Sequence, residues 1–555
     1  MQNNQKKIAV TYALPYANGS LHLGHLVGFI QTDVWVRFKK MLGADCLFLC
    51  GCDGHGTPIM IQAEKMNISP EELIENIRIE HKKDLNDFLI GLDNYHTTDS
   101  TENHKLVEEM FKRHNSNGNI HKKTIKQAFD PEKKMFLPDR YIKGDCPTCS
   151  AKDQYGDSCE VCGATYSPIE LKNSYSTLSG ATPIEKESEH YFFKLQNFET
   201  MLKEWTKQGH LQTQVINKLD EWFKTGLKDW DISRDSPYFG FKIPGEENKY
   251  FYVWLDAPIG YMASFQNLAQ TNSDLNFSEY WESDEKTELY HFIGKDIMYF
   301  HTLFWPALLK GASYRTPNAI YCHGFLTING QKMSKSRGTF IKASTYLKYL
   351  DPQYLRYYLC TKLNDRIEDL DINFEDFTQR VNSDLIGKFI NIASRSASFI
   401  HKYFNGFCSD KLENPELFEK FEISNESIAN KYKNREFSHA IREIMSLADL
   451  ANQYIDENKP WTTIKNPDNK QHVHEVCTMG INLFKSLMIY LKPILPEIAK
   501  KSEIFLNINP LQWSDINKPL LKHKLNEFTP LATRLDKKQI EALQLATKEE
   551  INQSI

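Results

Sequence analysis

A strand, a loop, a helix and a second strand follow one another in the first part of the chain. Residues Lys6–Tyr12 form an apolar run that is typical of a buried strand. From Leu23 to Met41, apolar side chains recur three and four residues apart, which predicts a helix. Residues Cys46–Cys50 read as the next strand. Two strands joined by a helix in this order indicate a parallel α/β unit, whose ligands bind beyond the carboxyl ends of the strands.

The same pattern returns later in the chain. Residues Leu289–Ile293 and Ala319–Cys322 read as strands, and Asp296–Leu309 reads as the helix between them. The stretch from about 118 to 250 then reads as an insertion between two halves of one α/β domain. Beyond Asp384 the pattern is mostly helical. A chain of 555 residues has room for several such domains.

The composition excludes several classes of protein. The chain has 41% hydrophobic and 25% charged residues, as is ordinary for a soluble globular protein. We find no long apolar run and no secretory leader, so no membrane is expected and the predicted location is cytoplasmic. The formal net charge of −5 gives no overall basic footprint, so a nucleic-acid partner requires a local basic face. The eleven cysteines are expected as thiols or metal ligands rather than disulfides.

Two short motifs carry most of the chemical signal. His22-Leu23-Gly24-His25 opens the first predicted helix, and a helix N-terminus binds phosphate well. Gly24 lets a nucleotide approach the backbone closely. Lys332-Met333-Ser334-Lys335-Ser336 follows a turn, and its lysines and hydroxyls suit the charge of a polyphosphate. Taken alone, the first motif is also compatible with surface histidines and the second with a solvated basic loop.

Together these motifs resemble the signature pair of class I aminoacyl-tRNA synthetases. Further stretches resemble the methionyl-tRNA synthetase family, in its bacterial type with a single zinc knuckle. These stretches are Ala13–His25, Cys52–Pro58, Trp230–Gly240, Tyr252–Tyr261, Gly294–Trp305, His323–Gly338 and Asn391–Arg395. The resemblance covers essentially the whole chain.

The resemblance also implies how the chain divides. It implies a Rossmann-like nucleotide-binding parallel sheet in two halves, 1–117 and 251–325, with an inserted connective domain that holds the zinc knuckle, 118–250. Three parts follow: a domain with the Lys332–Ser336 loop (326–384), an α-helical anticodon-binding bundle (385–534), and a C-terminal helix and tail (535–555).

Four cysteines have the spacing of metal ligands. Cys146 and Cys149 form one CxxC pair, and Cys159 and Cys162 form another. Two such pairs can present four thiolates tetrahedrally, which suits Zn²⁺. Four protein ligands leave no open position, so we expect one structural zinc ion; a redox site is the alternative reading. The resemblance implies that this knuckle helps to shape the site for the tRNA acceptor end.

The resemblance assigns further residues to catalysis and to ATP. It implies that the phosphates are handled during catalysis by His22, His25, Lys332, Lys335 and Arg234. It implies that ATP, with Mg²⁺ bridging its phosphates, is bound by Pro15, Tyr16, His22, Gly24, His25, Asp296, His323, Gly324 and Lys335.

The resemblance also implies a pocket for L-methionine. Its members are Leu14, Tyr16, Asp53, Trp254, Pro258, Tyr261 and His301. Asp53 would meet the substrate ammonium, because a carboxylate at a strand end is a suitable partner for a cation. Aromatic faces contact a thioether well. Without the resemblance, these aromatic residues and the histidine read as ordinary core.

The helix expected after Asp384 has two unlike faces. One face is apolar, with Ile386, Phe389, Ile390, Ala393, Ala397 and Ile400. The opposite face carries Lys388, Asn391, Arg395 and Lys402, which is also compatible with a plain solvated surface. The resemblance implies that Asn391, Arg395 and Trp461 read the CAU anticodon of the tRNA. Gly387 stands where some relatives carry an asparagine.

The sequence thus predicts a ligase that attaches L-methionine to initiator and elongator tRNA through methionyl-adenylate. We expect a monomer with no obligate protein partner. Three alternatives stay open. A cysteine-specific synthetase is disfavoured because that enzyme binds its substrate thiol at an open zinc site. A small-substrate nucleotidyltransferase would not need the helical C-terminal part, and intact signature motifs count against a tRNA-binding scaffold without catalysis.

Overall fold

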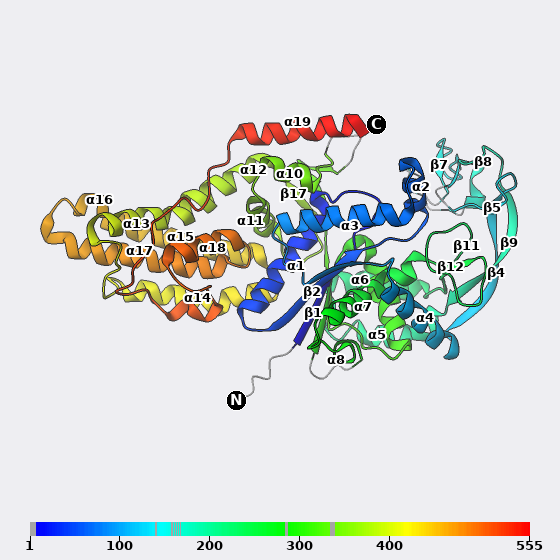
Figure 1. Cartoon of the computed structure of the whole chain (residues 1–555), viewed down its shortest axis with the longest axis horizontal. Helices are drawn as coiled ribbons and strands as arrows, with labels where there is room; N and C mark the ends of the chain where they lie inside the picture. Colours follow the sequence, from blue (N-terminus) through cyan, green and yellow to red (C-terminus); the bar gives the residue numbers. More distant parts are fainter. Residues whose placement is uncertain are drawn as a thin grey trace.

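The computed structural model is elongated, with a central sheet, a helical bundle at one end and a two-stranded arm at the other (Figure 1). The structure describes residues 7–138, 141–156, 159, 161–162, 164, 166, 168–282, 287–333 and 339–554. Within these ranges, no helix combines the length and the apolar character needed to cross a lipid bilayer.

Five parallel strands form the central sheet in the order β14-β13-β1-β2-β3. Their bounds are Lys7–Tyr12 (β1), Asp45–Cys52 (β2), Asn94–Thr97 (β3), Thr287–Gly294 (β13) and Ala319–His323 (β14). The predicted parallel α/β sheet is therefore confirmed. Strand order reverses at β1, which pairs with β2 on one side and with β13 on the other, so a ligand crevice is expected at the carboxyl ends of β1 and β13.

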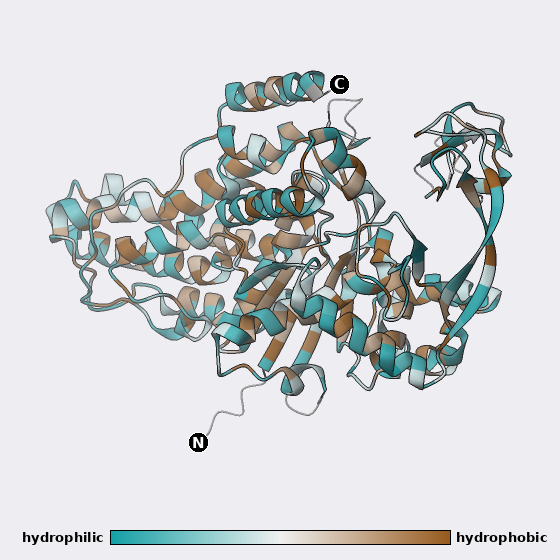
Figure 2. Ribbon diagram, turned by 45° about the vertical axis from the view of Figure 1, so that its right-hand side comes forward, coloured by the Kyte–Doolittle hydropathy of each residue, from teal (hydrophilic) through white to brown (hydrophobic). Residues whose placement is uncertain are grey.

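Both faces of this sheet are covered by helices. Alternate residues belong to two separate cores: Val10 packs in the core that includes α1 (Leu23–Met41), and Ala9 packs in the core that includes α7 (Val253–Thr271). Burial on both faces explains why β1 reads as a continuous apolar run rather than as an alternating pattern. The brown strands at the centre of Figure 2 contrast with the largely teal arm.

The arm is a long antiparallel pair formed by β4 (Ile120–Asp130) and β9 (Ile184–Phe193). It lies inside the expected insertion, 118–250. A small sheet at its far end, in the order β7-β6-β8, comprises Ile142–Asp145 (β6), Gln154–Tyr155 (β7) and Lys172–Ser176 (β8). Shorter elements return the chain to the centre: α5 (Glu199–Trp205), α6 (Thr213–Thr225), β10 (Trp230–Asp231), β11 (Ser233–Asp235) and β12 (Lys249–Phe251).

The stretch expected as one helix over Asp296–Leu309 is irregular, which corrects that prediction. A 3₁₀ turn covers Lys295–Ile297, wide π-type turns cover Phe300–Phe304, and α9 covers Trp305–Gly311. The Trp305 N–H reaches back five residues to the carbonyl of Phe300. Apolar spacing does not reveal one residue inserted into a helix, and such bulges often occur at functional sites.

The C-terminal part is helical, as predicted. A three-stranded sheet, β16-β15-β17, precedes it, with β15 at Leu326–Ile328, β16 at Gln331–Lys332 and β17 at Leu370–Ile372. The bundle contains α13 (Asn391–Phe404), α14 (Pro415–Lys433), α15 (Phe437–Asn458), α17 (Lys470–Leu491) and α18 (Pro496–Leu506). The last helix, α19 (Lys537–Ser554), packs on α10 (Ala343–Tyr349), where the Thr345 hydroxyl donates to Glu550 over 2.7 Å.

A buried ion pair joins the sheet to the bundle. Arg356 lies on α11 (Pro352–Lys362), is fully buried, and donates through Nη2 to Asp33 of α1 over 2.6 Å. Its Nε donates to the carbonyl of Ile494, between α17 and α18, over 2.8 Å. Asp33 also accepts from Arg37, so one carboxylate serves two guanidinium groups. The helix that opens with the His22 motif is thereby tied to the helical bundle.

Candidate active site

A cleft of about 1050 Å³ opens at the carboxyl ends of β1, β2, β13 and β14, where the strand order predicts a ligand site. The arm and β15–β16 contribute its other walls. Its lining includes Arg234, Lys332 and all the described residues predicted to bind ATP, namely Pro15, Tyr16, His22, Gly24, His25, Asp296, His323 and Gly324. Lys335 belongs to the segment 334–338, which lies outside the described residues.

The two histidines of the first motif cap helix α1 reciprocally. The Gly24 N–H donates to His22 Nδ1 over 3.1 Å, and the His22 N–H donates to His25 Nδ1 over 3.2 Å. The two rings stack with centroids 3.8 Å apart. A Cβ on Gly24 would lie 2.8 Å from His22 Cε1, so a glycine is needed here for the cap itself as well as for nucleotide approach. The sequence did not reveal that second requirement.

This cap decides where the imidazoles carry their protons. Burial lowers the pKa of His22 to about 4 and lowers that of His25 well below its ordinary value, so both rings are neutral at pH 7. Each Nδ1 accepts a backbone N–H, which places the single ring proton on Nε2. The N-terminus of α1 therefore presents two neutral Nε2–H donors at the positive end of the helix dipole, a suitable arrangement for phosphate oxygens.

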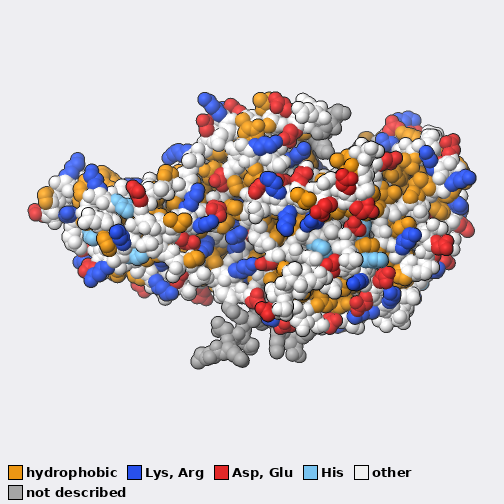
Figure 3. All heavy atoms as spheres, viewed as in Figure 1, with side chains coloured by type: hydrophobic (Ala, Val, Ile, Leu, Met, Phe, Trp, Pro, Cys, Tyr) orange, Lys and Arg blue, Asp and Glu red, His pale blue; other side chains and the backbone are white. Residues whose placement is uncertain are grey.

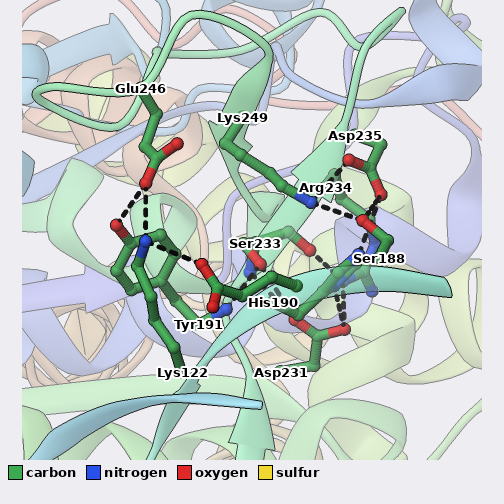
Figure 4. Close-up of polar contacts among 11 residues, drawn as sticks. Lys122, Ser188, His190, Tyr191, Asp231, Ser233, Arg234, Asp235, Glu246 and Lys249 are labelled. Atoms are coloured by element: carbon green, nitrogen blue, oxygen red, sulfur yellow. Dashed lines mark hydrogen bonds and ion pairs between the residues drawn. The ribbon is translucent and has the colours of Figure 1, made fainter. Parts of the chain in front are cut away.

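Arg234 is held in place by contacts within the protein. Its guanidinium lies 3.6 Å from the centroid of the Tyr252 ring and 3.4 Å from Asp231. In Figure 4, His190 of the arm lies between Asp231 and Asp235. Its Nδ1 is 2.8 Å from Asp231 Oδ2, and its Nε2 is 2.9 Å from Asp235 Oδ2. Burial opposes protonation, yet these two carboxylates raise the pKa of His190. His190 thus links β9 of the arm to Asp231 of β10 and to Asp235 of β11, the strand that carries Arg234.

Asp53 presents a buried oxygen that has no hydrogen-bond partner in the described part of the chain. Its backbone is fixed beside the first loop, because its N–H donates to the Pro15 carbonyl over 2.9 Å and its carbonyl accepts from Ala17 N–H over 2.8 Å. Its Oδ1 has no hydrogen-bond partner among the described residues. Burial, followed by the charge of Asp256, raises the pKa of Asp53 well above its ordinary value. A cationic group of a ligand would satisfy this oxygen.

The residues predicted to contact methionine divide into two layers. Leu14, Tyr16, Asp53 and Trp254 line the cleft directly. Pro258, Tyr261 and His301 are buried and are not part of its lining. His301 Nδ1 donates to the Ile297 carbonyl over 3.1 Å, so its Nε2 accepts from the Tyr261 hydroxyl over 2.8 Å.

Sequence reasoning missed several residues of this region. Phe300 stacks on Trp254 with ring centroids 3.9 Å apart. Behind Asp53, the imidazole of His55 forms an ion pair with Asp256 through Nδ1. The only available signal was the presence of His55 in the same loop as Asp53, because Asp256 lies 201 residues away in the chain.

The four predicted cysteine ligands converge at the end of the arm. Their sulfur atoms all lie within 4.8 Å of one another. The Sγ atoms of Cys146 and Cys162 are 3.8 Å apart, and those of Cys149 and Cys159 are 3.6 Å apart. Tetrahedral coordination with Zn–S bonds of about 2.3 Å requires separations of about 3.8 Å. The geometry can hold a metal ion, and it fits zinc.

The predicted anticodon residues share one region of the bundle. The Arg395 guanidinium lies 4.7 Å from the centroid of the Trp461 ring, and Trp461 is 40% exposed. Arg395 also forms an ion pair with Asp456 of α15. The predicted apolar face is buried except for Ile386, which is partly buried, but Arg380–Ile390 forms π-type turns and the regular helix α13 begins only at Asn391. The polar face is less basic than the sequence suggested, because Asp449 and Asp456 of α15 pair with Lys388 and Arg395. A Cβ on Gly387 would lie 3.0 Å from the carbonyl oxygen of Asn382.

Two family models together match most of the chain. The family described as tRNA synthetases class I (M) matches residues 8–397, and the anticodon binding domain of methionyl tRNA ligase matches residues 409–532. A Mycobacterium tuberculosis methionyl-tRNA synthetase in complex with methionyl-adenylate is similar in structure, with a TM-score of 0.79 and 23% identity over 95% of this chain and 99% of that chain. The apo form of the enzyme from the same organism has a TM-score of 0.72 and 22% identity, and the match covers 97% of this chain and 100% of that chain.

The structural likeness shows a shared fold at this level of identity, and the first family match spans well over half of the sequence. That match includes the strands and loops which build the cleft. The chain belongs to the methionyl-tRNA synthetase family of class I aminoacyl-tRNA synthetases.

Proposed function

We propose that this chain activates L-methionine with ATP and transfers it to tRNA with a CAU anticodon, both initiator and elongator. The observation that carries the proposal is the composition of the cleft. One cleft holds the Asp53 carboxylate, one oxygen of which has no hydrogen-bond partner among the described residues, the neutral donors of His22 and His25, and the fixed guanidinium of Arg234. These groups suit the ammonium of an amino acid and the phosphates of a nucleotide.

The proposed first step is adenylation. The methionine carboxylate attacks the α-phosphorus of ATP, the bond to the β-phosphate oxygen breaks, and pyrophosphate leaves with that electron pair. The carboxylate is already a nucleophile, so the protein contributes positioning and charge stabilisation rather than a general base. His22 and His25 donate Nε2–H to phosphate oxygens, and Arg234, Lys332 and Lys335 stabilise the charge on the leaving pyrophosphate. Mg²⁺ that accompanies ATP neutralises part of the phosphate charge.

The other residues in and behind the walls of the cleft are assigned to the two substrates. Asp53 binds the substrate ammonium. Leu14, Tyr16 and Trp254 surround the side chain, with Pro258, Tyr261 and His301 behind them. Pro15, Gly24, Asp296, His323 and Gly324 bind the nucleotide. In the second step a ribose hydroxyl of the terminal adenosine attacks the adenylate, forms the ester and releases AMP; class I membership favours the 2′-hydroxyl.

Amino-acid-dependent exchange between ATP and pyrophosphate tests the proposal without tRNA. Methionine, cysteine, leucine and no amino acid are compared with folded, zinc-loaded protein. Exchange confined to methionine is expected. Exchange with cysteine instead would overturn the pocket assignment, and no exchange with any amino acid would favour a tRNA-binding scaffold.

We propose that the four cysteines hold one structural Zn²⁺. Purified protein is expected to contain about one zinc per chain, and Cys159→Ser is expected to lose it because three thiolates coordinate zinc far less tightly than four. Cys408→Ser, which removes a buried thiol outside the cluster, should keep the metal. Metal analysis by mass spectrometry checks both. Retention of zinc in Cys159→Ser would show that the ion is held elsewhere.

Trp461 and Arg395 are proposed, with Asn391, to recognise the anticodon. Trp461→Ala is expected to lower kcat/KM for tRNA in aminoacylation about 5- to 150-fold, because a stacked base contributes about 1–3 kcal/mol. Exchange without tRNA should not change. Trp461→Phe keeps an aromatic ring and should lose less. An equal loss in both reactions would place the defect in folding rather than in tRNA recognition.

A further inference from the structure

Asp53, the proposed ammonium site, belongs to a buried cluster of charged groups whose other members the adenylation mechanism does not use. His55 lies in the loop between β2 and α2 (Thr57–Met66), two residues after Asp53. Its side chain is buried. Its Nδ1 faces Asp256 of α7, and its Nε2 lies 3.5 Å from Asp99, which follows β3. Both ring nitrogens thus face carboxylates, which only accept hydrogen bonds, so the geometry favours the doubly protonated imidazolium.

The other neighbours of His55 complete its surroundings. The rings of Phe239 and Phe241 meet it edge-on, with centroids 5.5 Å and 4.5 Å away. His104 stacks on Phe241 and pairs with Glu108. The backbone carbonyl of His55 accepts from the Tyr16 hydroxyl over 2.8 Å. The ring charge and this carbonyl therefore act on two different residues of the cleft.

The charges of this cluster do not balance. Asp53, Asp256 and Asp99 supply three carboxylates, whereas His55 supplies one cation. Among the described residues, Asp53 Oδ1 and Asp256 Oδ1 have no hydrogen-bond partner. Burial opposes protonation of His55, but Asp256 and Asp99 raise its pKa to about 10, so the ring stays charged at neutral pH. Burial and then the charge of Asp256 raise the pKa of Asp53, and His55 acts in the opposite direction.

We propose that His55 is a positioning residue of the methionine site, whose imidazolium offsets the buried charge of Asp256 and Asp99 and so permits Asp53 to ionise and bind the substrate ammonium. This inference rests on the proposed activation of methionine. It makes His55 responsible for the pH range over which methionine binds, although the ring itself does not line the cleft.

The test is the pH dependence of methionine-dependent exchange between ATP and pyrophosphate. In His55→Gln, the acid limb of kcat/KM for methionine should move up by about 1–3 pH units, the size of shift that a nearby opposite charge produces. The loss should be about 10-fold or more at the acid end and should shrink toward pH 8.5. KM for ATP should stay within about 2-fold, because the cluster adjoins the ammonium site and not the phosphates.

Two further variants separate charge from structure. Asp99→Asn removes a carboxylate and keeps the imidazolium, so its acid limb should not move up. His114→Gln removes another buried histidine, which hydrogen-bonds to the Leu308 carbonyl and not to a carboxylate, so it should leave the pH profile unshifted. If His55→Gln does not fold, His55→Asn, whose amide can still donate to Asp256, is measured in its place.

The outcomes are distinct. An acid limb that moves up in the His55 variant alone supports the inference. A loss that is equal at every pH, an equal rise in KM for ATP, or the same upward shift in Asp99→Asn would overturn it. If the unmodified protein shows no methionine-dependent exchange, the proposed function fails; if it exchanges normally and only the predicted shift is missing, the function stands and this inference fails.

Discussion

Asp53→Asn is expected to lower kcat/KM for methionine in pyrophosphate exchange by roughly 30- to 4,000-fold. The substitution keeps the shape of the side chain and removes its charge. Truncating one partner of a buried charge pair costs about 2–5 kcal/mol, and each 1.4 kcal/mol corresponds to a factor of ten. The effect should fall mainly on KM for methionine, because the proposed partner is the substrate ammonium. Steady-state exchange at several methionine concentrations measures it.

Asp45→Asn is the matched control for this prediction. Asp45 opens the same strand, β2, but its side chain is exposed at the opposite end of the sheet from the cleft. This variant should retain both KM values. If Asp53→Asn lowered kcat/KM by less than about 5-fold, the ammonium would have to bind elsewhere in the cleft.

Arg356→Met is expected to lower the free energy of unfolding by about 3–5 kcal/mol, the usual cost of removing one member of a buried ion pair. Arg356 is fully buried, and its loss would leave the Ile494 carbonyl without this donor and would weaken the pairing of Asp33. Methionine fills a similar volume, so the effect should come from lost polar contacts rather than from a cavity. Urea unfolding, followed by circular dichroism and by tryptophan fluorescence, measures the change.

Arg37→Met separates burial from charge in the same network. Arg37 donates to the same carboxylate, Asp33, but its side chain is 30% exposed. In this variant Asp33 keeps its buried partner Arg356, so Arg37→Met should lower the free energy of unfolding by less than Arg356→Met does. Equal destabilisation by the two substitutions would mean that burial of Arg356 is not what makes its pairing strong.

The central sheet could be predicted because its signals are local. Apolar runs mark β1 and β2, and the helical spacing between them marks α1. The zinc cluster was predictable for the same reason, since each CxxC pair is a local motif. His22 and His25 were recognised as a phosphate-binding motif, but their tautomer depends on a backbone cap that only the structure reveals.

Residues that meet across long separations could not be predicted. His55 and Asp256 come together only when the two halves of the sheet assemble. Arg356 looks like a surface residue in the sequence, because nothing local indicates that α1 and the bundle enclose it. The polar face of α13 looked free of acids, yet Asp456 of α15 contacts Arg395. Figure 3 shows basic and acidic side chains interspersed over one whole face, as the small net charge suggested.

The pairing of β1 with β13 also bears on how the chain is made. Thr11 of β1 and His291 beside it are 280 residues apart, so a ribosome that has just completed β1, α1 and β2 still has the whole arm to synthesise before β13 emerges. During that interval one edge of β1 has unpaired N–H and C=O groups in an apolar strand, which is a template for association with other chains. Newly synthesised protein should therefore depend on chaperones until the second half of the sheet appears.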